Sequence, residues 1–418
     1  MSQLLNGQFM IKGLAIAVTT LMVGTAHAAK TEQQQIQELR QEVEALKSLI
    51  QQQQQVQQQQ QTQIAQVQQA KPAAPVSALS SLKSKSGADV SIYGFVRGDA
   101  NYIIKGADND FNSASTSNEE ASDKLRATAK VTRLGLDFNT PVGDNKVGGK
   151  VEVDFASAAE NLRIRHAYLT LNNWLFGQTT SNFLSNHAPE MIDFNTNIGG
   201  GTARVPQVRY NYKLAPATQL FVSAEEGNSS GDGLTYRVPN LTAKVTQTYA
   251  EGKGTASARA LVEHYKSDTA NDDKTGWGAA LGTNYQVTEP LKVSADVSYV
   301  KGNNNYLYGN NADPAYKLDG NSIEQNETIG VQVGATYKFS PQLRSTLAYG
   351  ALFADDGTDY ARLNTGANEK VQQAWINFIY SPVKPVDLGI EYINGERETF
   401  AGEKFSDDRV GFMARYSF

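Results

Sequence analysis

Positively charged side chains in this sequence alternate with apolar ones along short stretches. Arg209 lies between Val208 and Tyr210, and Arg409 immediately precedes Val410. Neighbouring residues of an extended strand point to opposite faces, so the charges and the apolar groups would lie on separate faces. A guanidinium group binds both oxygens of a carboxylate through its planar fork. The chemistry that this spacing suggests is therefore the reversible binding of small anions.

The same alternation predicts a larger set of cations on polar strand faces. The candidate pore-lining and anion-binding side chains are Arg97, Arg133, Lys150, Arg163, Arg165, Arg204, Arg209 and Arg409. Residues 162–171 fit less well, because Arg163 and Arg165 share their parity with Leu169 and Leu171. We place both arginines on the polar face, since an arginine that faces lipid costs about 2–4 kcal/mol at mid-bilayer. In an alternative interpretation, these arginines only balance acidic side chains in a mixed network.

No constellation of catalytic residues stands out. The histidines beyond the first 28 residues are His166, His187 and His264, which are far apart and form no His-Glu-x-x-His motif. There is no Gly-x-Ser-x-Gly elbow. The glycine-rich stretches 199–201 and 231–233 lack the strand-to-helix context of a phosphate-binding loop. We expect no enzymatic activity, no metal site and no cofactor.

The overall composition excludes several classes of protein. The chain has 418 residues, a formal net charge of −5 and no cysteine. No basic block suggests a nucleic-acid partner, and the paired cysteines that staple many exported domains are absent. A mean hydropathy of −0.44 excludes a bundle of membrane-spanning helices. It is compatible with a transmembrane barrel, in which only every second strand residue meets lipid.

Three segments precede the alternating region. Residues 1–28 have the layout of a secretory signal peptide, with an uncleaved anchor as the alternative. Residues 29–69 carry apolar side chains at heptad spacing between Ile36 and Ile50, which predicts a short periplasmic α-helical coiled coil. The glutamine tract that follows leaves a disordered spacer as the alternative. The proline and serine residues of 70–88 predict a flexible linker.

Residues 89–418 alternate between apolar and polar side chains over about ten residues at a time. In residues 329–339, for example, Val331, Val333 and Tyr337 interleave with glycine, glutamine, threonine and lysine. A strand of that length crosses a bilayer when it is tilted. In a chain with no apolar helical span after the signal peptide, the repeated pattern predicts an all-β transmembrane barrel of antiparallel strands.

Short turns and long polar loops alternate along this region, as they do in outer-membrane barrels. If residues 238–240 were a turn, there would be seventeen strands, and the short and long connections would fall out of step. Placing Pro239 in a long loop restores the alternation, and proline is unwelcome within a closed ladder. We therefore predict sixteen strands, with an aromatic girdle that includes Tyr337, Tyr416 and Phe418 near the short-turn end.

Three short motifs carry a resemblance to a known family. They are Tyr93-Gly94-Phe95-Val96-Arg97, Arg204-Val205-Pro206-Gln207-Val208-Arg209-Tyr210, and the alternating strand that ends in Phe418. Together with the signal peptide and the glutamine-rich heptad segment, their order over nearly the full length resembles the DcaP-like porins, named for dicarboxylic acid uptake. The resemblance implies a sixteen-stranded trimer in the outer membrane that passes small anionic solutes, particularly dicarboxylates.

The resemblance also implies a constriction, because in such porins the third outer loop folds inward and narrows the pore. Residues 180–204 are the second long loop of our count and the candidate for this role. Its charged or titratable members are His187, Glu190, Asp193 and Arg204. Most other acidic side chains gather in predicted outer loops, so the wall is relatively cationic. We expect anion preference, since a narrow low-dielectric constriction focuses the field of its lining.

The expected partners are small anionic solutes, outer-membrane lipid and lipopolysaccharide, and further copies of this chain. The heptad positions favour two strands by the simplest rule, whereas the resemblance implies a trimer. The alternative functions are a general non-selective porin and a structural envelope protein with a coiled-coil tether. The acidic outer loops are either solvated surface or a site for divalent cations that bridge lipopolysaccharide phosphates.

Overall fold

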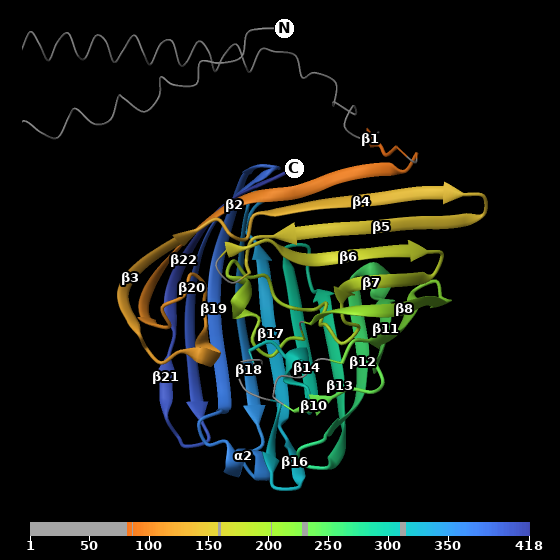
Figure 1. The fold of residues 1–418 in the computed structure, drawn as a ribbon. Coiled ribbons are helices and arrows are strands. Elements are labelled where there is room, and N and C mark those ends of the chain that lie inside the picture. The colour runs from red at the N-terminus through yellow and green to blue at the C-terminus, as the bar shows by residue number, and fades with distance from the viewer. Residues whose placement is uncertain (1–81, 86, 158–159, 202, 228–232, 310–314) are drawn as a thin grey trace, which may run out of the picture. The chain divides into compact units, whose positions relative to one another are not determined.

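The computed structural model describes residues 82–85, 87–157, 160–201, 203–227, 233–309 and 315–418 (Figure 1). The predicted signal peptide and coiled coil, and most of the predicted linker, lie outside the described residues. Among the described residues, no helix is long and apolar enough to cross a membrane.

Long antiparallel strands make up most of the described chain. The strands of the wall are β2 (Asp89–Gly106), β3 (Ala121–Thr128), β4 (Arg133–Val142), β5 (Asn145–Asp154), β6 (Arg163–Leu171), β7 (Trp174–Thr180), β8 (Arg204–Ala215), β9 (Thr218–Glu225), β11 (Asn240–Tyr249), β12 (Gly254–Ser267), β13 (Asp272–Gln286), β14 (Leu291–Lys301), β17 (Glu327–Lys338), β18 (Leu343–Ala354), β19 (Asn368–Val383), β20 (Val386–Thr399) and β22 (Asp408–Ser417). The shorter elements are β1 (Leu82–Lys83), the 3-10 helices η2 (Ala114–Thr116), η4 (Phe194–Thr196), η5 (Ala250–Gly252) and η6 (Asn304–Tyr306), the strands β10 (Leu234–Thr235), β15 (Tyr316–Asp319), β16 (Ser322–Gln325) and β21 (Lys404–Ser406), and the helix α2 (Asp359–Leu363).

The strands close into a barrel. Apart from β3 and β4, each wall strand pairs with the next along the chain, and β22 pairs back onto β2, from Phe95 opposite Ser417 to Lys105 opposite Asp408 (Figure 1). The first half of β2 pairs with β4 and the second half with β3, so β3 and β4 act as one interrupted strand. Counted in this way the barrel has sixteen strands, which confirms the prediction.

Tight turns connect the strands at one end, and longer loops connect them at the other, apart from the short connection 268–271. Pro239 lies in a long connection just before β11, as predicted. Residues 155–162 form a further connection at the long-loop end, which the sequence count missed. Residues 181–203, hereafter loop 3, are therefore the third connection at that end and not the second. The sequence also assigned Leu82–Lys83 to the linker, but these residues form β1 and pair with the start of β2.

Side chains alternate across the wall as the pattern predicts. Apolar residues such as Val96, Leu281 and Leu347 are exposed on the outer face. Polar residues between them, such as Ser298 and Asn377, are buried inside. At the short-turn end the exposed side chains include the predicted girdle residues Tyr337, Tyr416 and Phe418, together with Phe339 and Tyr380.

A β-bulge in β6 explains why residues 162–171 did not fit the alternation. Glu152 of β5 pairs with His166, and the next residue, Val153, pairs with Ile164, so Arg165 is the extra residue. An extra residue lets two successive side chains face the same side of a sheet. Arg163 and Arg165 both face inward, while Ile164 is exposed on the outer face.

Glycines on the inner face leave room for loop 3 inside the barrel. A Cβ on Gly350 of β18 would lie 2.2 Å from the carbonyl oxygen of Ile198. On β17, a Cβ on Gly330 would lie 2.7 Å from the carbonyl oxygen of Gly199, and one on Gly334 would lie 2.6 Å from the Pro189 side chain. These wall strands therefore accept loop 3 only because they lack side chains at the contact points.

We predict that Gly350→Ala loosens loop 3 from the wall while the barrel still folds. The new methyl group would meet backbone that cannot rotate away, and overpacking of this kind costs about 1–3 kcal/mol. Proteolysis within residues 181–203 of the folded protein should become roughly tenfold faster, or more. Gly98→Ala is the matched control, because a Cβ there meets nothing within 4 Å. Equal cleavage rates for the two variants would contradict this account.

Candidate functional site

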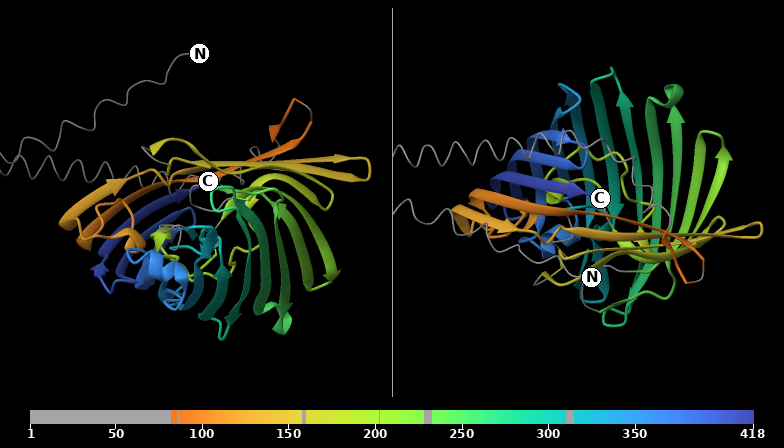
Figure 2. Two further views of the ribbon diagram at one scale, coloured as in Figure 1. Left: turned by 60° about the horizontal axis from the view of Figure 1, so that its bottom comes forward. Right: turned by 90° about the horizontal axis from the view of Figure 1, so that it is seen from above.

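Loop 3 runs through the interior of the barrel and is held by hydrogen bonds to its wall (Figure 2). The carboxylate of Glu391 on β20 accepts the backbone N–H groups of Ile192 and Asp193, each at 2.8 Å. Arg97 on β2 donates to the carbonyl oxygen of Ile192 at 2.7 Å. Gln332 on β17 donates to that of Ile198 at 2.9 Å. Strands β17, β20 and β2, which lie along one arc of the ring, therefore hold the same loop.

The titratable residues of loop 3 point toward the wall and neighbouring loops. His187 Nε2 lies 3.0 Å from the hydroxyl oxygen of Ser257. Glu190 forms a bidentate ion pair with Arg344, with a shortest distance of 2.8 Å. Asp193 accepts the backbone N–H of Asn112 at 2.6 Å. None of the three lines the cavity described below, so their observed contacts anchor the loop.

Asp193 is the most deeply buried titratable group of loop 3. Burial raises the pKa of its carboxyl to about 6, although the N–H groups of Asn112 and Asn195 favour the charged form. Burial likewise lowers the pKa of His187. The imidazole is therefore neutral at neutral pH.

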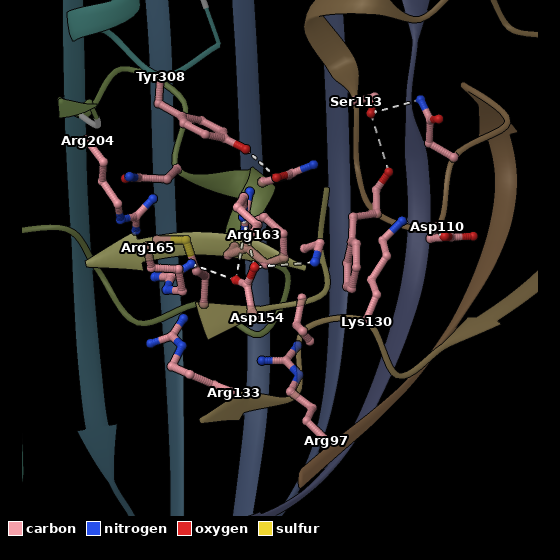
Figure 3. Close-up of a pocket in the computed structure, with 18 of the residues that line it drawn as sticks. Arg97, Asp110, Ser113, Lys130, Arg133, Asp154, Arg163, Arg165, Arg204 and Tyr308 are labelled. Carbon is pink, nitrogen blue, oxygen red and sulfur yellow. Dashed lines mark hydrogen bonds and ion pairs between the residues drawn. The ribbon is translucent and has the colours of Figure 1, made fainter. Parts of the chain in front are cut away.

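A cavity of about 760 Å³ lies between loop 3 and the wall formed by β2 to β8 (Figure 3). In the close-up, Arg204, Arg165 and Arg133 follow one another down one side, with Lys130 and Asp110 on the other. Seven cationic side chains and two carboxylates line the cavity: Arg97, Arg126, Lys130, Arg133, Arg163, Arg165 and Arg204, with Asp110 and Asp154. The loop 3 side supplies apolar surface from Leu184, Met191 and Phe194.

Three of these guanidinium groups share two carboxylates. Asp154 accepts from Arg163 at 2.7 Å and from Arg165 at 2.9 Å. Glu152, next to the cavity, accepts from Arg165 at 2.7 Å and lies 3.5 Å from Arg133. The guanidinium group of Arg204 forms no hydrogen bond or ion pair with any residue that the structure describes, and its Nε is buried. This part of the wall therefore carries an excess of positive charge.

Two of the lining cations, Arg126 and Lys130, were missed by the sequence interpretation. Both pair with Asp110 of the first long loop, at 2.7 and 2.5 Å. Burial alone would raise the pKa of Asp110, but these two partners outweigh burial and hold its pKa below the ordinary value. Lys130 lies in the break between β3 and β4, where strand parity is lost and alternation gives no signal.

Three predicted cations lie outside the cavity. Lys150 faces inward nearer the short turns and is paired with Asp137 at 3.1 Å. Arg209 donates to the side-chain oxygen of Gln207 at 2.8 Å. Arg409 is fully buried against Asp407 at 2.6 Å and holds the carbonyl oxygens of the first long loop. Arg409 thus faces the interior as expected, but its donors are occupied in anchoring that loop.

Comparison with known proteins relates the whole barrel to one family. A model of the DcaP outer membrane protein family matches residues 21–418. The crystal structure of the outer membrane channel DcaP of Acinetobacter baumannii has 71% sequence identity and a TM-score of 0.79, and the match covers 81% of this chain and 100% of that chain. An anion-selective porin from Comamonas acidovorans shares the fold at 14% identity, with a TM-score of 0.54 over 79% of this chain and 100% of that one. OmpT, an outer membrane protein of Vibrio cholerae, also shares the fold. Its sequence identity is 15% and its TM-score is 0.53, over 81% of this chain and 99% of that one. No curated protein sequence matches this chain.

We predict that loop 3 is held more tightly at low pH. The pKa of Asp193 in the docked loop, about 6, lies above the ordinary value, so docking favours the protonated form. Docking is strongest below about pH 4 and weakens as the pH rises through 6. Hydrogen exchange of the amides of residues 181–203, corrected for the intrinsic pH dependence, should rise roughly tenfold or more between pH 4 and pH 7.5.

Asp193→Asn should make this pH profile less steep, because the substituted side chain does not titrate, whereas the Glu391 carboxyl that binds the same loop still does. The control is Asp359→Asn, which removes an exposed carboxylate at the start of α2 that pairs with Arg362. A wild-type profile that is already flat, or a profile that is unchanged in Asp193→Asn, would rule out Asp193 as a titrating group.

Proposed function

This chain belongs to the DcaP outer membrane protein family, and we propose that its barrel passes small anionic solutes, dicarboxylates among them, through the cavity beside loop 3. The family and the fold make it an outer-membrane channel. Selectivity in such a channel is decided by the charges at its narrow part. The proposal therefore depends on the lining of that cavity.

The observation that carries the proposal is the unequal sharing of charge along β4 to β8. Arg133, Arg163, Arg165 and Arg204 have only Glu152 and Asp154 between them. Arg204 is unpaired among the described residues and Arg133 is only loosely paired. A solute carboxylate can complete the hydrogen bonding of such a guanidinium group, and two separated groups suit a dicarboxylate.

The opposite side of the cavity supports solutes with a hydrocarbon body. Leu184, Met191 and Phe194 of loop 3 face the cationic wall across the cavity. An apolar surface gives favourable contact to the methylene groups between two carboxylates while the arginines hold the charged ends. A simple inorganic anion would use only the arginines.

The alternative function is a general porin without charge preference. The ion pairs of Arg97 with Asp99 and of Arg163 with Asp154 favour it, because these cations are already balanced. The unpaired state of Arg204 favours the anion channel instead. The two functions differ in the sign of the expected reversal potential and in the uptake of neutral solutes.

We further propose that the channel is a homotrimer with a periplasmic coiled coil, embedded in outer-membrane lipid and lipopolysaccharide. The support is the heptad pattern in residues 29–69 and the family resemblance of the sequence. Crosslinking of the full chain in the membrane, compared with a variant that lacks these residues, distinguishes a trimer held by the coiled coil from one held by the barrels.

We predict an anion-selective reversal potential in planar bilayers under a potassium chloride gradient. In liposomes, succinate should permeate faster than a neutral sugar of similar size. Arg204→Gln should reduce the succinate advantage roughly threefold to tenfold, since a charge-assisted hydrogen bond is worth about 1.5–3 kcal/mol before solvent screening. Arg362→Gln is the control, because Arg362 is an exposed arginine of the helix α2.

A cation-selective reversal potential in the wild-type protein would overturn the proposal. Equal permeation of succinate and sugar would leave only a general porin. If Arg204→Gln and Arg362→Gln lowered succinate permeation equally, the effect would come from the overall charge of the mouth and not from the cavity.

A further inference from the structure

A second group of cations lies inside the barrel, apart from the cavity. Its central member is Lys244 on β11, which is only 7% exposed and shares the inner face with Asn240 and Thr242. Lys244 lies opposite Phe221 on β9 and Arg259 on β12. None of these residues lines the cavity between loop 3 and β2 to β8.

Lys244 is buried without an acceptor. Its ammonium group forms no hydrogen bond or ion pair within the described part of the chain, and its nitrogen lies 5.2 Å from the centroid of the Phe221 ring. An ammonium group has three donors and no acceptor. Buried charges are normally paired, and a buried polar group without a partner points to a bound water or ion.

The charges around Lys244 do not supply the missing partner. The nearest carboxylate, that of Glu225, already accepts from Thr242 at 2.5 Å, Tyr306 at 3.0 Å and Ser223 at 2.8 Å. Asp296, the other carboxylate of this region, is held by Arg259 at 2.6 Å, with both side chains fully buried. Both carboxylates are therefore engaged elsewhere.

Arg209 adds a second cation without a carboxylate partner. It extends inward from β8, and β9 lies between β8 and β11. Its guanidinium donates to Gln207 and to the carbonyl oxygen of Thr180, and it forms no ion pair with a described residue. Arg209 pairs with Ser223 of β9, and Ser223 pairs with Thr242 of β11, which is two residues from Lys244 on the same inner face. Two neighbouring cations without carboxylate partners create a local field that favours an anion.

We propose that Lys244 and Arg209 form a second anion-binding site, which holds one carboxylate group of a passing solute. The site goes beyond the proposed function, because its residues are separate from the cavity that would set selectivity. A compact ammonium and a guanidinium fork together offer donors to both oxygens of a single carboxylate. The beginning of loop 3 lies beside this site, because Arg259, which is opposite Lys244, donates to the carbonyl oxygen of Phe183 at 3.1 Å. A solute would then meet two anion sites in succession.

Bromide is a suitable probe, because it is a small anion that anomalous diffraction detects directly. In crystals of the full chain soaked in bromide, we expect an anomalous peak within hydrogen-bond distance of Lys244 Nζ. The peak should disappear in Lys244→Met, which keeps the side-chain length against Phe221, and remain in Lys213→Met, an exposed position on β8. Added acetate should displace the bromide if the site takes carboxylates. Absence of the peak in the wild-type crystals, a peak that survives in Lys244→Met, or bromide that acetate does not displace would overturn the proposal.

Conductance gives a test in the membrane. Anion conductance in potassium acetate should saturate with concentration, and the half-saturation concentration should rise at least threefold in Lys244→Met. Lys244→Arg should restore saturation, which separates lost binding from misfolding. Equal half-saturation in the wild type and Lys244→Met would overturn the site. If the wild-type channel were cation-selective but bound bromide at Lys244, only the selectivity proposed above would be wrong. If it were anion-selective but bound no bromide there, only this second site would be wrong.

Discussion

The ladder between β22 and β2 is the contact on which the rest of this structure depends. Strands that cross hydrocarbon must pair every backbone N–H and C=O group, and only a closed ring leaves no edge. Here the last strand completes the ring by pairing with the first from Phe95 to Lys105. Closure sends alternate side chains to lipid and to the interior. A ring of sixteen strands is too wide for its own side chains to fill, so a long loop can fold inside.

Loop 3 divides the interior into two unlike halves. Its backbone groups also need partners, and Glu391, Gln332 and Asn377 on β17 to β20 provide them, with glycines that make room. The polar groups of that half of the wall are occupied in holding the loop. On β4 to β8 the inward side chains meet the cavity instead, and there cations outnumber carboxylates. A net charge of −5 for the chain therefore says little about the pore.

Local sequence patterns predicted the fold well. The candidate site, in contrast, is formed by contacts between residues that are far apart in the sequence. The strand count followed from side-chain period and loop length, which neighbouring residues determine. The bulge at Arg165 breaks that period at a single residue, so parity could not assign Arg163 and Arg165. Nothing near His187 or Asp193 in sequence reveals that their partners come from β12 and from the first long loop. The sequence identified cationic side chains by their residue type. Which of them lie together at one cavity depends on the closure of the barrel.

The way Glu391 holds loop 3 has a consequence for how such channels diverge. The carboxylate binds the backbone N–H groups of Ile192 and Asp193, which every residue except proline possesses. The attachment is therefore largely indifferent to the identity of the side chains that loop 3 presents to the cavity. Leu184, Met191 and Phe194 can therefore be substituted during evolution while the loop stays attached to the wall. Evolution can thus alter the preferred solute of such a channel without rebuilding its scaffold.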